Sequence, residues 1–313
     1  MTEQPVVFGI DHGYYNMKSK NCVFASGLTA YAHEPYTKEN VLEIGGKFYV
    51  VGSARQALQK DKTATEDYYL LTLAAIAREI EFRKMSRTAK VHIAAGLPLT
   101  SFGRDKQKFR NYLLREGQPV QFSYEGRNYT VTIADVSLFP QGYAAILMQR
   151  DLLEEPSVIA ADIGGWTVDL MRLDRQIPNA ASCRSLEQGL IVCLNNIAEQ
   201  ARRQLGISPT AAQIESVLRG ENPGLPQRLK ELIHTEARAY VQNLLSAIME
   251  SGLDVRAMPT VFMGGGASLL KRYAPAAGEL CRAVILDDVC LNAKGYEALQ
   301  KQLNEQAKQV QNG

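Results

Sequence analysis

An aspartate followed two positions later by a glycine occurs at the end of two short apolar runs. Asp11 follows apolar residues 6–10, and Asp162 follows apolar residues 158–161. A carboxylate at the end of a strand can hold hydrated Mg²⁺, and glycine lets backbone N–H groups close around phosphate oxygens. The repeated pattern therefore predicts two similar lobes that close on one nucleotide.

The residues after the second aspartate indicate phosphate binding more specifically than those after the first. In the first copy, Lys18 can neutralise a phosphate as a point charge. In the second copy, paired glycines precede Thr167 and Asp169, which add a hydroxyl and a second carboxylate. The competing interpretation of both copies is an ordinary hairpin turn, because aspartate and glycine favour turns. Trp166, the only tryptophan, either covers the second loop or fills a core.

A third glycine-rich element, Gly264-Gly265-Gly266, joins a predicted strand to a predicted helix. Three glycines allow the backbone to approach a flat or anionic ligand, and the helix N-terminus adds partial positive charge. Taken alone, the element is better explained as a tight strand-to-helix joint. Its position after the two aspartate loops favours a nucleotide site.

Composition limits the function classes. A chain of 313 residues with 46% apolar and 22% charged residues is typical of two packed domains. A net charge of +2 gives no case for direct binding to nucleic acid or to a membrane. The chain has no apolar stretch of the roughly 20 residues that a bilayer requires. Because the N-terminus lacks a basic region and an apolar core, we do not expect export.

The cysteines and histidines predict neither disulfides nor zinc. Five cysteines form no Cys-x-x-Cys pair, and their odd number fits no closed disulfide framework. Four histidines are scattered without the spacing of metal ligands. Reduced thiols are typical of a cytoplasmic protein, which is the location we expect.

Hydrophobic periodicity predicts which elements position these loops. Strands are expected at residues 6–10, 16–24, 91–95, 158–161, 167–173, 181–186, 260–263 and 283–286, with hairpins over 41–51 and 120–134. Helices are expected at 68–83, 102–115, 143–153, 190–205, 210–218, 225–251 and 291–310. A strand–turn–strand unit followed by alternating strands and helices occurs twice, which predicts a duplicated α/β fold.

The order of these loops resembles the actin and sugar-kinase superfamily. Within it, the chain is most similar to the bacterial plasmid-segregation actins of the ParM/StbA group. The similar stretches are residues 10–18, 96–99, 109–110, 139–143, 161–169 and 263–269. The resemblance implies an actin-like ATPase fold with two duplicated ribonuclease-H-like domains flanking a nucleotide cleft. Domain I would span residues 1–154, completed by the C-terminal helix 291–313, and domain II residues 155–290.

The resemblance also implies roles for individual residues. Asp11 and Asp162 would hold Mg²⁺ through water, and Gly264, Gly265 and Gly266 would face adenosine with Gly189 nearby. The β- and γ-phosphates of ATP, or alternatively GTP, would contact Gly13, Tyr14, Tyr15, Asn16 and Lys18 from one side and Gly164, Gly165, Trp166 and Thr167 from the other. Since bulky Tyr14 and Tyr15 stand where the superfamily often has small hydroxyl residues, we expect backbone amides to contact the phosphates.

Gln141 matches the superfamily position that orients or activates the attacking water. Some ParM proteins have glutamate there, whereas this chain has glutamine, as actin does. Glutamine is not a strong base, so the mechanism implied is water positioning with electrostatic stabilisation. Basal hydrolysis would be slow and would accelerate in the filament. The competing interpretation is a polar residue at a helix N-terminus.

The function that the resemblance implies is a filament-forming actin-like ATPase that segregates plasmid DNA. The partners would be further copies of the chain and a DNA-bound adaptor of the ParR type, with no direct contact to DNA or membrane. Two alternatives remain at this stage: a small-molecule kinase of the same superfamily, and a chromosomal or cell-shape actin. The stripe of Leu299, Leu303, Ala307 and Val310 is narrow for a membrane anchor and favours docking on the first domain over binding a partner helix.

Overall fold

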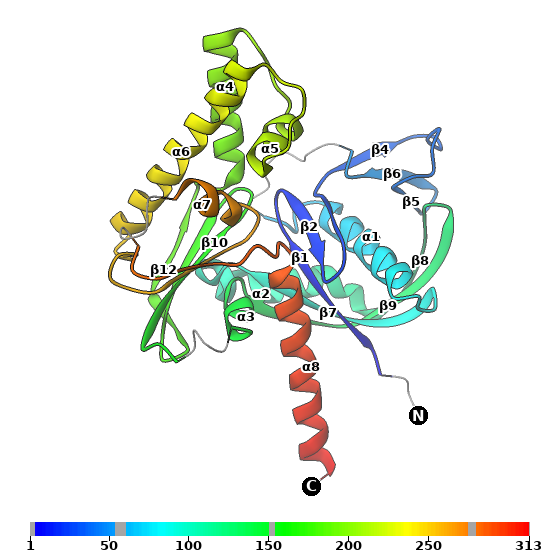
Figure 1. Cartoon of the computed structure of the whole chain (residues 1–313). Helices are drawn as coiled ribbons and strands as arrows, with labels where there is room; N and C mark the ends of the chain where they lie inside the picture. Colours follow the sequence, from blue (N-terminus) through cyan, green and yellow to red (C-terminus); the bar gives the residue numbers. More distant parts are fainter. Residues whose placement is uncertain (1–3, 54–60, 150–153, 275–279, 313) are drawn as a thin grey trace. The chain divides into compact units, whose positions relative to one another are not determined.

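The computed structural model describes residues 4–53, 61–149, 154–274 and 280–312. The chain divides into two compact units (Figure 1). Unit 1 comprises residues 1–148 and 290–313, and unit 2 comprises residues 149–289. The boundaries that the sequence led us to expect lie after residues 154 and 290.

Unit 1 contains a nine-stranded mixed sheet in the order β3-β2-β1-β7-β9-β8-β5-β6-β4. The strands are β1 (Val6–His12), β2 (Asn16–Ser19), β3 (Val23–Ala25), β4 (Leu28–Tyr31), β5 (Val41–Ile44), β6 (Lys47–Val51), β7 (Thr88–Leu97), β8 (Pro119–Tyr124) and β9 (Arg127–Pro140). The helices are α1 (Asp67–Phe82), α2 (Leu99–Leu114), α3 (Tyr143–Leu147) and α8 (Leu291–Asn312), with a short 3₁₀ turn at Arg115–Gly117.

The alternation of side chains along β1 divides the core of unit 1 between two faces of the sheet. Phe8 and Ile10 pack in the large core that includes the buried residues of α1. Val7 belongs to a smaller cluster with Tyr296 of α8. Successive strand residues point to opposite faces, so both faces of β1 are covered. This explains the uninterrupted apolar run before Asp11.

Helix α8 lies unusually close to the sheet because glycine occupies the contact points. A Cβ atom at Gly9 of β1 would overlap the carbonyl oxygen of Ala293, and one at Gly96 of β7 would overlap the ring of Tyr296. Tyr296 is fully buried and stacks on Phe139 with their ring centroids 6.1 Å apart. The C-terminal helix is therefore part of the core of unit 1.

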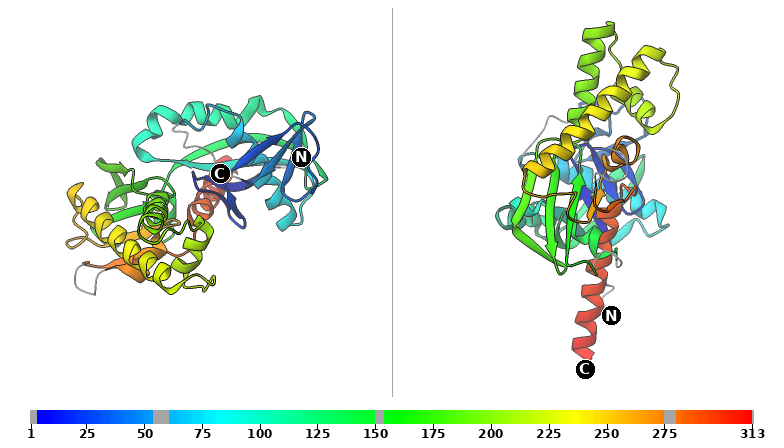
Figure 2. Two further views of the ribbon diagram at one scale, coloured as in Figure 1. Left: turned by 90° about the horizontal axis from the view of Figure 1, so that it is seen from above. Right: turned by 60° about the vertical axis from the view of Figure 1, so that its left-hand side comes forward.

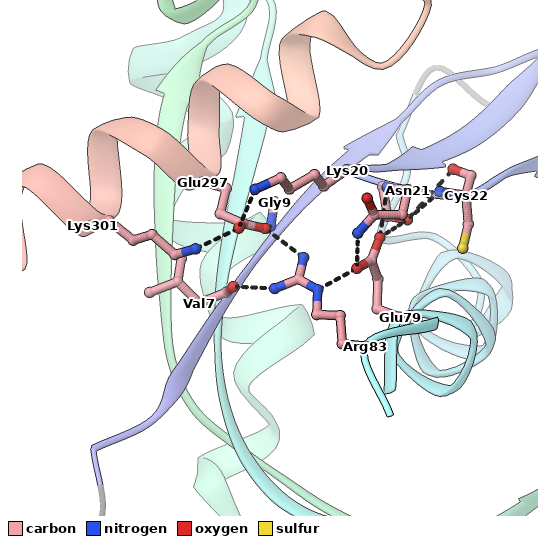
Figure 3. A network of polar contacts seen from close by, with 10 residues as sticks. Val7, Gly9, Lys20, Asn21, Cys22, Glu79, Arg83, Glu297 and Lys301 are labelled. Carbon is pink, nitrogen blue, oxygen red and sulfur yellow. Dashed lines mark hydrogen bonds and ion pairs between the residues drawn. The ribbon is translucent and has the colours of Figure 1, made fainter. Parts of the chain in front are cut away.

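A buried charge network joins α8 to β1 and α1 (Figure 3). The Glu297 carboxylate accepts hydrogen bonds from the Gly9 amide at 3.4 Å, from Arg83 at 2.7 Å and from Lys301 at 2.6 Å. Arg83 also donates to Glu79 at 2.6 Å. Burial opposes the ionisation of Glu297, but the bonds from Lys301 and Arg83 outweigh it and hold the pKa of the carboxyl below its usual value.

Unit 2 contains a five-stranded sheet in the order β12-β11-β10-β13-β14. Its strands are β10 (Ser157–Ile163), β11 (Val168–Asp174), β12 (Ile177–Leu186), β13 (Thr260–Met263) and β14 (Ala283–Ile285). Its helices are α4 (Leu190–Leu205), α5 (Ala211–Arg219), α6 (Gln227–Glu250) and α7 (Ala267–Tyr273). Strands β10 and β11 are antiparallel, whereas β10, β13 and β14 run parallel.

The same strand order occurs in both units. In unit 1, β3-β2-β1 is an antiparallel group followed by the parallel strands β7 and β9. In unit 2, β12-β11-β10 is followed in the same way by β13 and β14. The duplicated α/β fold predicted from the sequence is present.

Several elements differ in length from the sequence prediction. The strand expected over residues 16–24 is two strands, β2 and β3, separated by a turn in which the Ser19 amide donates to the Cys22 carbonyl at 2.8 Å. The helix expected over residues 143–153 ends at Leu147, and residues 150–153 lie outside the described residues. Strand β4 was not predicted, because its four residues carry little periodicity.

The last turns of α8 extend beyond the strands on which its first turns pack, as Figure 1 and the right-hand view of Figure 2 show. Leu303 is 50% exposed and Val310 is 83% exposed. In the described part of the chain, no helix is long and apolar enough to cross a membrane.

The Glu297→Gln substitution tests the charge network. It is expected to lower the free energy of unfolding by about 2 kcal/mol at pH 7, because Arg83 loses a charged hydrogen-bond partner. Since folding lowers the pKa of Glu297, the difference from wild type is expected to shrink as the pH falls below about 4.5. Urea unfolding across this pH range measures both effects. Glu305→Gln, on the exposed part of α8, is the control; equal effects of the two variants would contradict the assignment.

Candidate functional site

The two aspartate patterns form equivalent hairpin turns. The first loop, residues 13–16, joins β1 to β2, and the second loop, residues 164–167, joins β10 to β11. Asp11 lies opposite Lys18 in the first hairpin, and Asp162 lies opposite Asp169 in the second. The backbone of both loops is therefore a hairpin turn. Whether such a turn can bind an anion depends on the direction of its backbone N–H groups.

The carbonyl groups of the second loop are occupied by consecutive amides around the start of α4. Gly189 donates to the Trp166 carbonyl at 2.8 Å, Leu190 to the Gly164 carbonyl at 3.0 Å and Ile191 to the Gly165 carbonyl at 2.8 Å. Gly189 is the N-cap residue of α4, and a Cβ there would come within 2.5 Å of the Trp166 backbone. A larger residue would push the helix start away from the loop.

These bonds determine the direction of the amides in the second loop. In a trans peptide, the N–H points opposite to the C=O of the same unit. With the carbonyls of residues 164–166 turned toward α4, the N–H groups of Gly165, Trp166 and Thr167 point to the other side. Successive N–H groups directed the same way form an anion-binding concavity. The second loop therefore has the backbone arrangement of a phosphate-binding turn.

In the first loop, Ser26 and Lys62 bond to the backbone carbonyls, in place of the helix amides that do so in the second loop. The Ser26 hydroxyl donates to the Gly13 carbonyl at 2.6 Å, and the Ser26 amide donates to the Tyr15 carbonyl at 3.0 Å. The ammonium group of Lys62 donates to the carbonyl of His12, which immediately precedes the loop. By the same peptide geometry, the N–H groups of Gly13, Tyr14 and Asn16 are directed away from these donors.

Asp11, Lys18 and Gln141 lie together at the end of β1. The Lys18 ammonium is 3.3 Å from the Asp11 carboxylate, and the Gln141 side-chain amide donates to the same carboxylate at 3.3 Å. Both Asp11 and Lys18 are buried. The backbone N–H of Gln141 donates to the Leu97 carbonyl at 2.9 Å, and the backbone N–H of Gly142 donates to the Asn292 side chain of α8 at 3.1 Å. The sequence-predicted catalytic glutamine is therefore held beside the strand-end carboxylate of unit 1.

In unit 2, the glycine triplet packs against the second loop. Gly264 has φ +88°, and a Cβ there would overlap the Asp162 carboxylate. The Gly266 amide donates to the Ile163 carbonyl at 3.0 Å. Gly265 has no heavy atom of the described structure near its Cβ position. The triplet thus places bare backbone beside the buried carboxylate of Asp162.

The remaining side chains of the second loop are only partly enclosed. Trp166 is half-buried and is not among the buried core residues, so the interpretation in which it fills a core is not supported. The Thr167 hydroxyl donates to Asp169 at 3.2 Å, and the Ser185 hydroxyl donates to the other oxygen of that carboxylate at 2.6 Å. Asp169 therefore fixes the Thr167 side chain. Gly189, which the sequence associated with the adenosine loop, is placed against Gly165 and Trp166.

His12 is a packing residue. Its side chain is fully buried, its Nε2 atom lies 2.9 Å from the Thr72 hydroxyl, and its ring contacts Phe109 edge-on at 5.1 Å. Burial and the charge of Lys62 lower the pKa of His12 to about 3, so the imidazole is neutral at physiological pH.

Sequence reasoning missed Ser26, Lys62 and the role of the α4 N-terminus. Ser26 and Lys62 carry no motif, and they reach the first loop only through the folded chain. Gly189 precedes the predicted helix 190–205, but nothing in the sequence indicated that the amides of residues 189–191 bond to the second loop.

Comparison with known proteins supports an actin-like fold. Residues 9–143 match the family model of the actin-like proteins' N-terminal domain. No curated protein sequence matches the chain. Among solved structures, the chain is similar to the actin-like protein Alp7A (14% identity, TM-score 0.76, covering 98% of this chain and 99% of that one).

Two further structures have the same fold. The archaeal actin homolog Ta0583 in complex with ADP has 18% identity and a TM-score of 0.74, over 95% of this chain and 99% of that one. A 15-stranded ParM filament from Clostridium botulinum has 19% identity and a TM-score of 0.73, over 96% of this chain and 100% of that one. The resemblance and the fold class inferred from the sequence are confirmed: the chain has the actin-like fold, and its residues 9–143 match the N-terminal domain of actin-like proteins.

Proposed function

We propose that the protein is a filament-forming nucleoside triphosphatase that segregates plasmid DNA. The observation that supports nucleotide binding most strongly is the second loop, where three amides around the start of α4 occupy three carbonyls and direct the opposite N–H groups outward. Such N–H groups suit phosphate oxygens. The archaeal homolog of similar fold in complex with ADP is consistent with this assignment.

The charged residues around the loops fit a nucleotide carried with Mg²⁺. Asp11 and Asp162 are buried carboxylates at strand ends, which suits them to hold the waters of a hydrated cation. The Lys18 ammonium lies 3.3 Å from the Asp11 carboxylate and would neutralise phosphate charge. When bound, Mg²⁺ supplies charge neutralisation at the phosphates. The nucleotide is ATP in this proposal, with GTP as an outcome of the test below.

Gln141 is the residue we assign to orienting the attacking water. Its side-chain amide is already aligned on Asp11, and its backbone is held by Leu97. A neutral amide can hold a water by accepting and donating hydrogen bonds but removes its proton poorly. Slow hydrolysis in the free protein follows from this chemistry.

Self-association is the part of the proposal that rests on likeness of fold. Two neighbours are described as filament structures, a ParM from Clostridium botulinum and Alp12. We propose that this chain likewise polymerises with bound nucleotide in the cytoplasm. A DNA-bound adaptor of the ParR type would connect the filament to a plasmid, with no direct contact between this chain and DNA or membrane.

Polymerisation provides the first test of this proposal. Light scattering is expected to rise after addition of ATP–Mg²⁺ and to decay as phosphate is released, and electron microscopy is expected to show filaments. Parallel samples with GTP–Mg²⁺ compare the nucleotides, and samples with EDTA provide the control. Absence of filaments with either nucleotide, together with phosphate transfer to a metabolite, would favour the small-molecule kinase and overturn the segregation proposal.

Gly189→Ala tests the second loop. The added Cβ would meet the Trp166 and Gly165 backbone at 2.5–2.6 Å, although φ −69° and ψ 179° at this position suit any residue. We expect the substitution to displace the loop and weaken ATP binding about tenfold or more, as measured by calorimetry. Gly103→Ala, which has open space at its Cβ within α2, is the control. Equal affinity in the two variants would contradict the role of the second loop.

Gln141→Ala tests the assignment of the water-orienting residue. It is expected to lower kcat for phosphate release about 10- to 100-fold while changing the Kd for ATP less than threefold, because the lost interaction acts on the attacking water. Gln121→Ala, at an exposed position of β8, is the control. Unchanged turnover in the Gln141 variant would reject this role.

A further inference from the structure

Lys62 is a buried cation at the base of the first loop. It precedes α1 in the chain, and its residue is only 8% exposed. Its ammonium donates to the His12 carbonyl and lies 4.9 Å from the centroid of the Tyr14 ring and 5.7 Å from that of Tyr68. A hydrogen bond from an ammonium is stronger than one between neutral groups, and a desolvated cation is attracted to aromatic faces. Lys62 therefore contacts both the backbone and a side chain of this hairpin.

Comparison of the two hairpins shows that Lys62 takes the place of a backbone amide donor. His12 and Ile163 each follow the strand-end aspartate by one position. The Ile163 carbonyl accepts a hydrogen bond from the Gly266 amide at 3.0 Å. In unit 1, the strand parallel to β1 is β7, and the helix that follows it, α2, has Pro98 as its N-cap residue. Proline has no amide proton, so it cannot donate the corresponding hydrogen bond. The ammonium of Lys62 supplies the donor that a backbone amide supplies in unit 2.

The segment that carries Lys62 is fixed to α2. The Tyr112 hydroxyl donates to the Thr65 carbonyl at 2.8 Å, and Arg115, at the C-terminal end of α2, pairs with Glu66. The residues that follow Lys62 are therefore anchored, so the ammonium is presented to the hairpin from a supported position. A lysine on an unsupported segment would lose more side-chain and backbone freedom in making the same contacts.

We propose that Lys62 is a positioning residue for the first loop. It holds the His12 carbonyl and the Tyr14 ring, so that the loop's N–H groups keep their outward direction before a nucleotide arrives. The function of the loop as a phosphate-binding turn rests on the proposed function, whereas the ordering of the loop by Lys62 does not. Preorganised donors bind a ligand more tightly because less order is lost on binding.

The test compares Lys62→Met, which keeps the length of the side chain and removes its charge, with Lys62→Arg and Lys108→Met. Lys108→Met removes an exposed lysine that pairs with Asp61, next to Lys62, and is the matched control. In the nucleotide-free full chain, amide hydrogen exchange of peptides covering residues 10–18 is expected to be at least tenfold faster in Lys62→Met than in wild type. Lys108→Met and Lys62→Arg are expected to stay within threefold of wild type.

Nucleotide binding and turnover provide the second measurement. For ADP–Mg²⁺ measured by calorimetry, Lys62→Met is expected to raise Kd about tenfold or more, and Lys62→Arg to recover most of the affinity. With ATP, KM is expected to rise more than kcat falls. If wild type binds neither ADP nor ATP, the proposed function fails, and the exchange measurement still decides the role of Lys62.

The outcomes that overturn the proposal are equally specific. If folded Lys62→Met exchanges its amide hydrogens over residues 10–18 at the wild-type rate, the proposal is overturned. Equal changes in this exchange rate in Lys62→Met and Lys108→Met would also overturn it. If thermal melting shows that Lys62→Met does not fold, Tyr14→Leu removes the ring contact and keeps the ammonium. Exchange in that variant is expected to be at least threefold faster than in wild type, and unchanged exchange would overturn the proposal.

Discussion

Hydrogen bonds to a few backbone carbonyls set the direction in which the N–H groups of both hairpin loops point. A trans peptide cannot turn its C=O inward without turning its N–H outward. In unit 2, the amides of residues 189–191 occupy the carbonyls of the second loop. The N–H groups of residues 165–167 therefore point to the opposite side without any side chain being involved. Glycine at position 189 is required because the helix start and the loop backbone are nearly in contact.

The two units reach similar loop conformations by different means. Unit 2 uses only backbone donors: the start of α4 and the amide of Gly266. Unit 1 uses the hydroxyl and the backbone amide of Ser26 and the ammonium of Lys62. Duplication thus preserved the strand order and the hairpin, while the supporting donors diverged. The first loop therefore depends on the side chains of Ser26 and Lys62, whereas the second depends on the close backbone approach that Gly189 permits.

Helix α8 provides the support behind β1. Gly9 and Gly96 let it lie against the sheet, and Glu297 links it to the Gly9 amide and to Arg83 (Figure 3). Asp11 stands only two positions beyond Gly9, on the same strand. The first turns of the C-terminal helix therefore help to fix the strand that carries the first carboxylate.

The sequence alone was sufficient to predict the fold class, the duplication and both aspartate hairpins, because these depend on local patterns: apolar runs, helical periodicity and glycine after a strand-end carboxylate. Gln141 was found through a family resemblance, and the structure places it beside Asp11. The extent of α3 and the division between β2 and β3 depended on tertiary packing and were misjudged. Ser26, Lys62 and the amides of α4 were not identified, since their donors become partners of the loops only when distant segments meet. Local patterns thus determined where the loops are, and tertiary hydrogen bonds decided which way their N–H groups point.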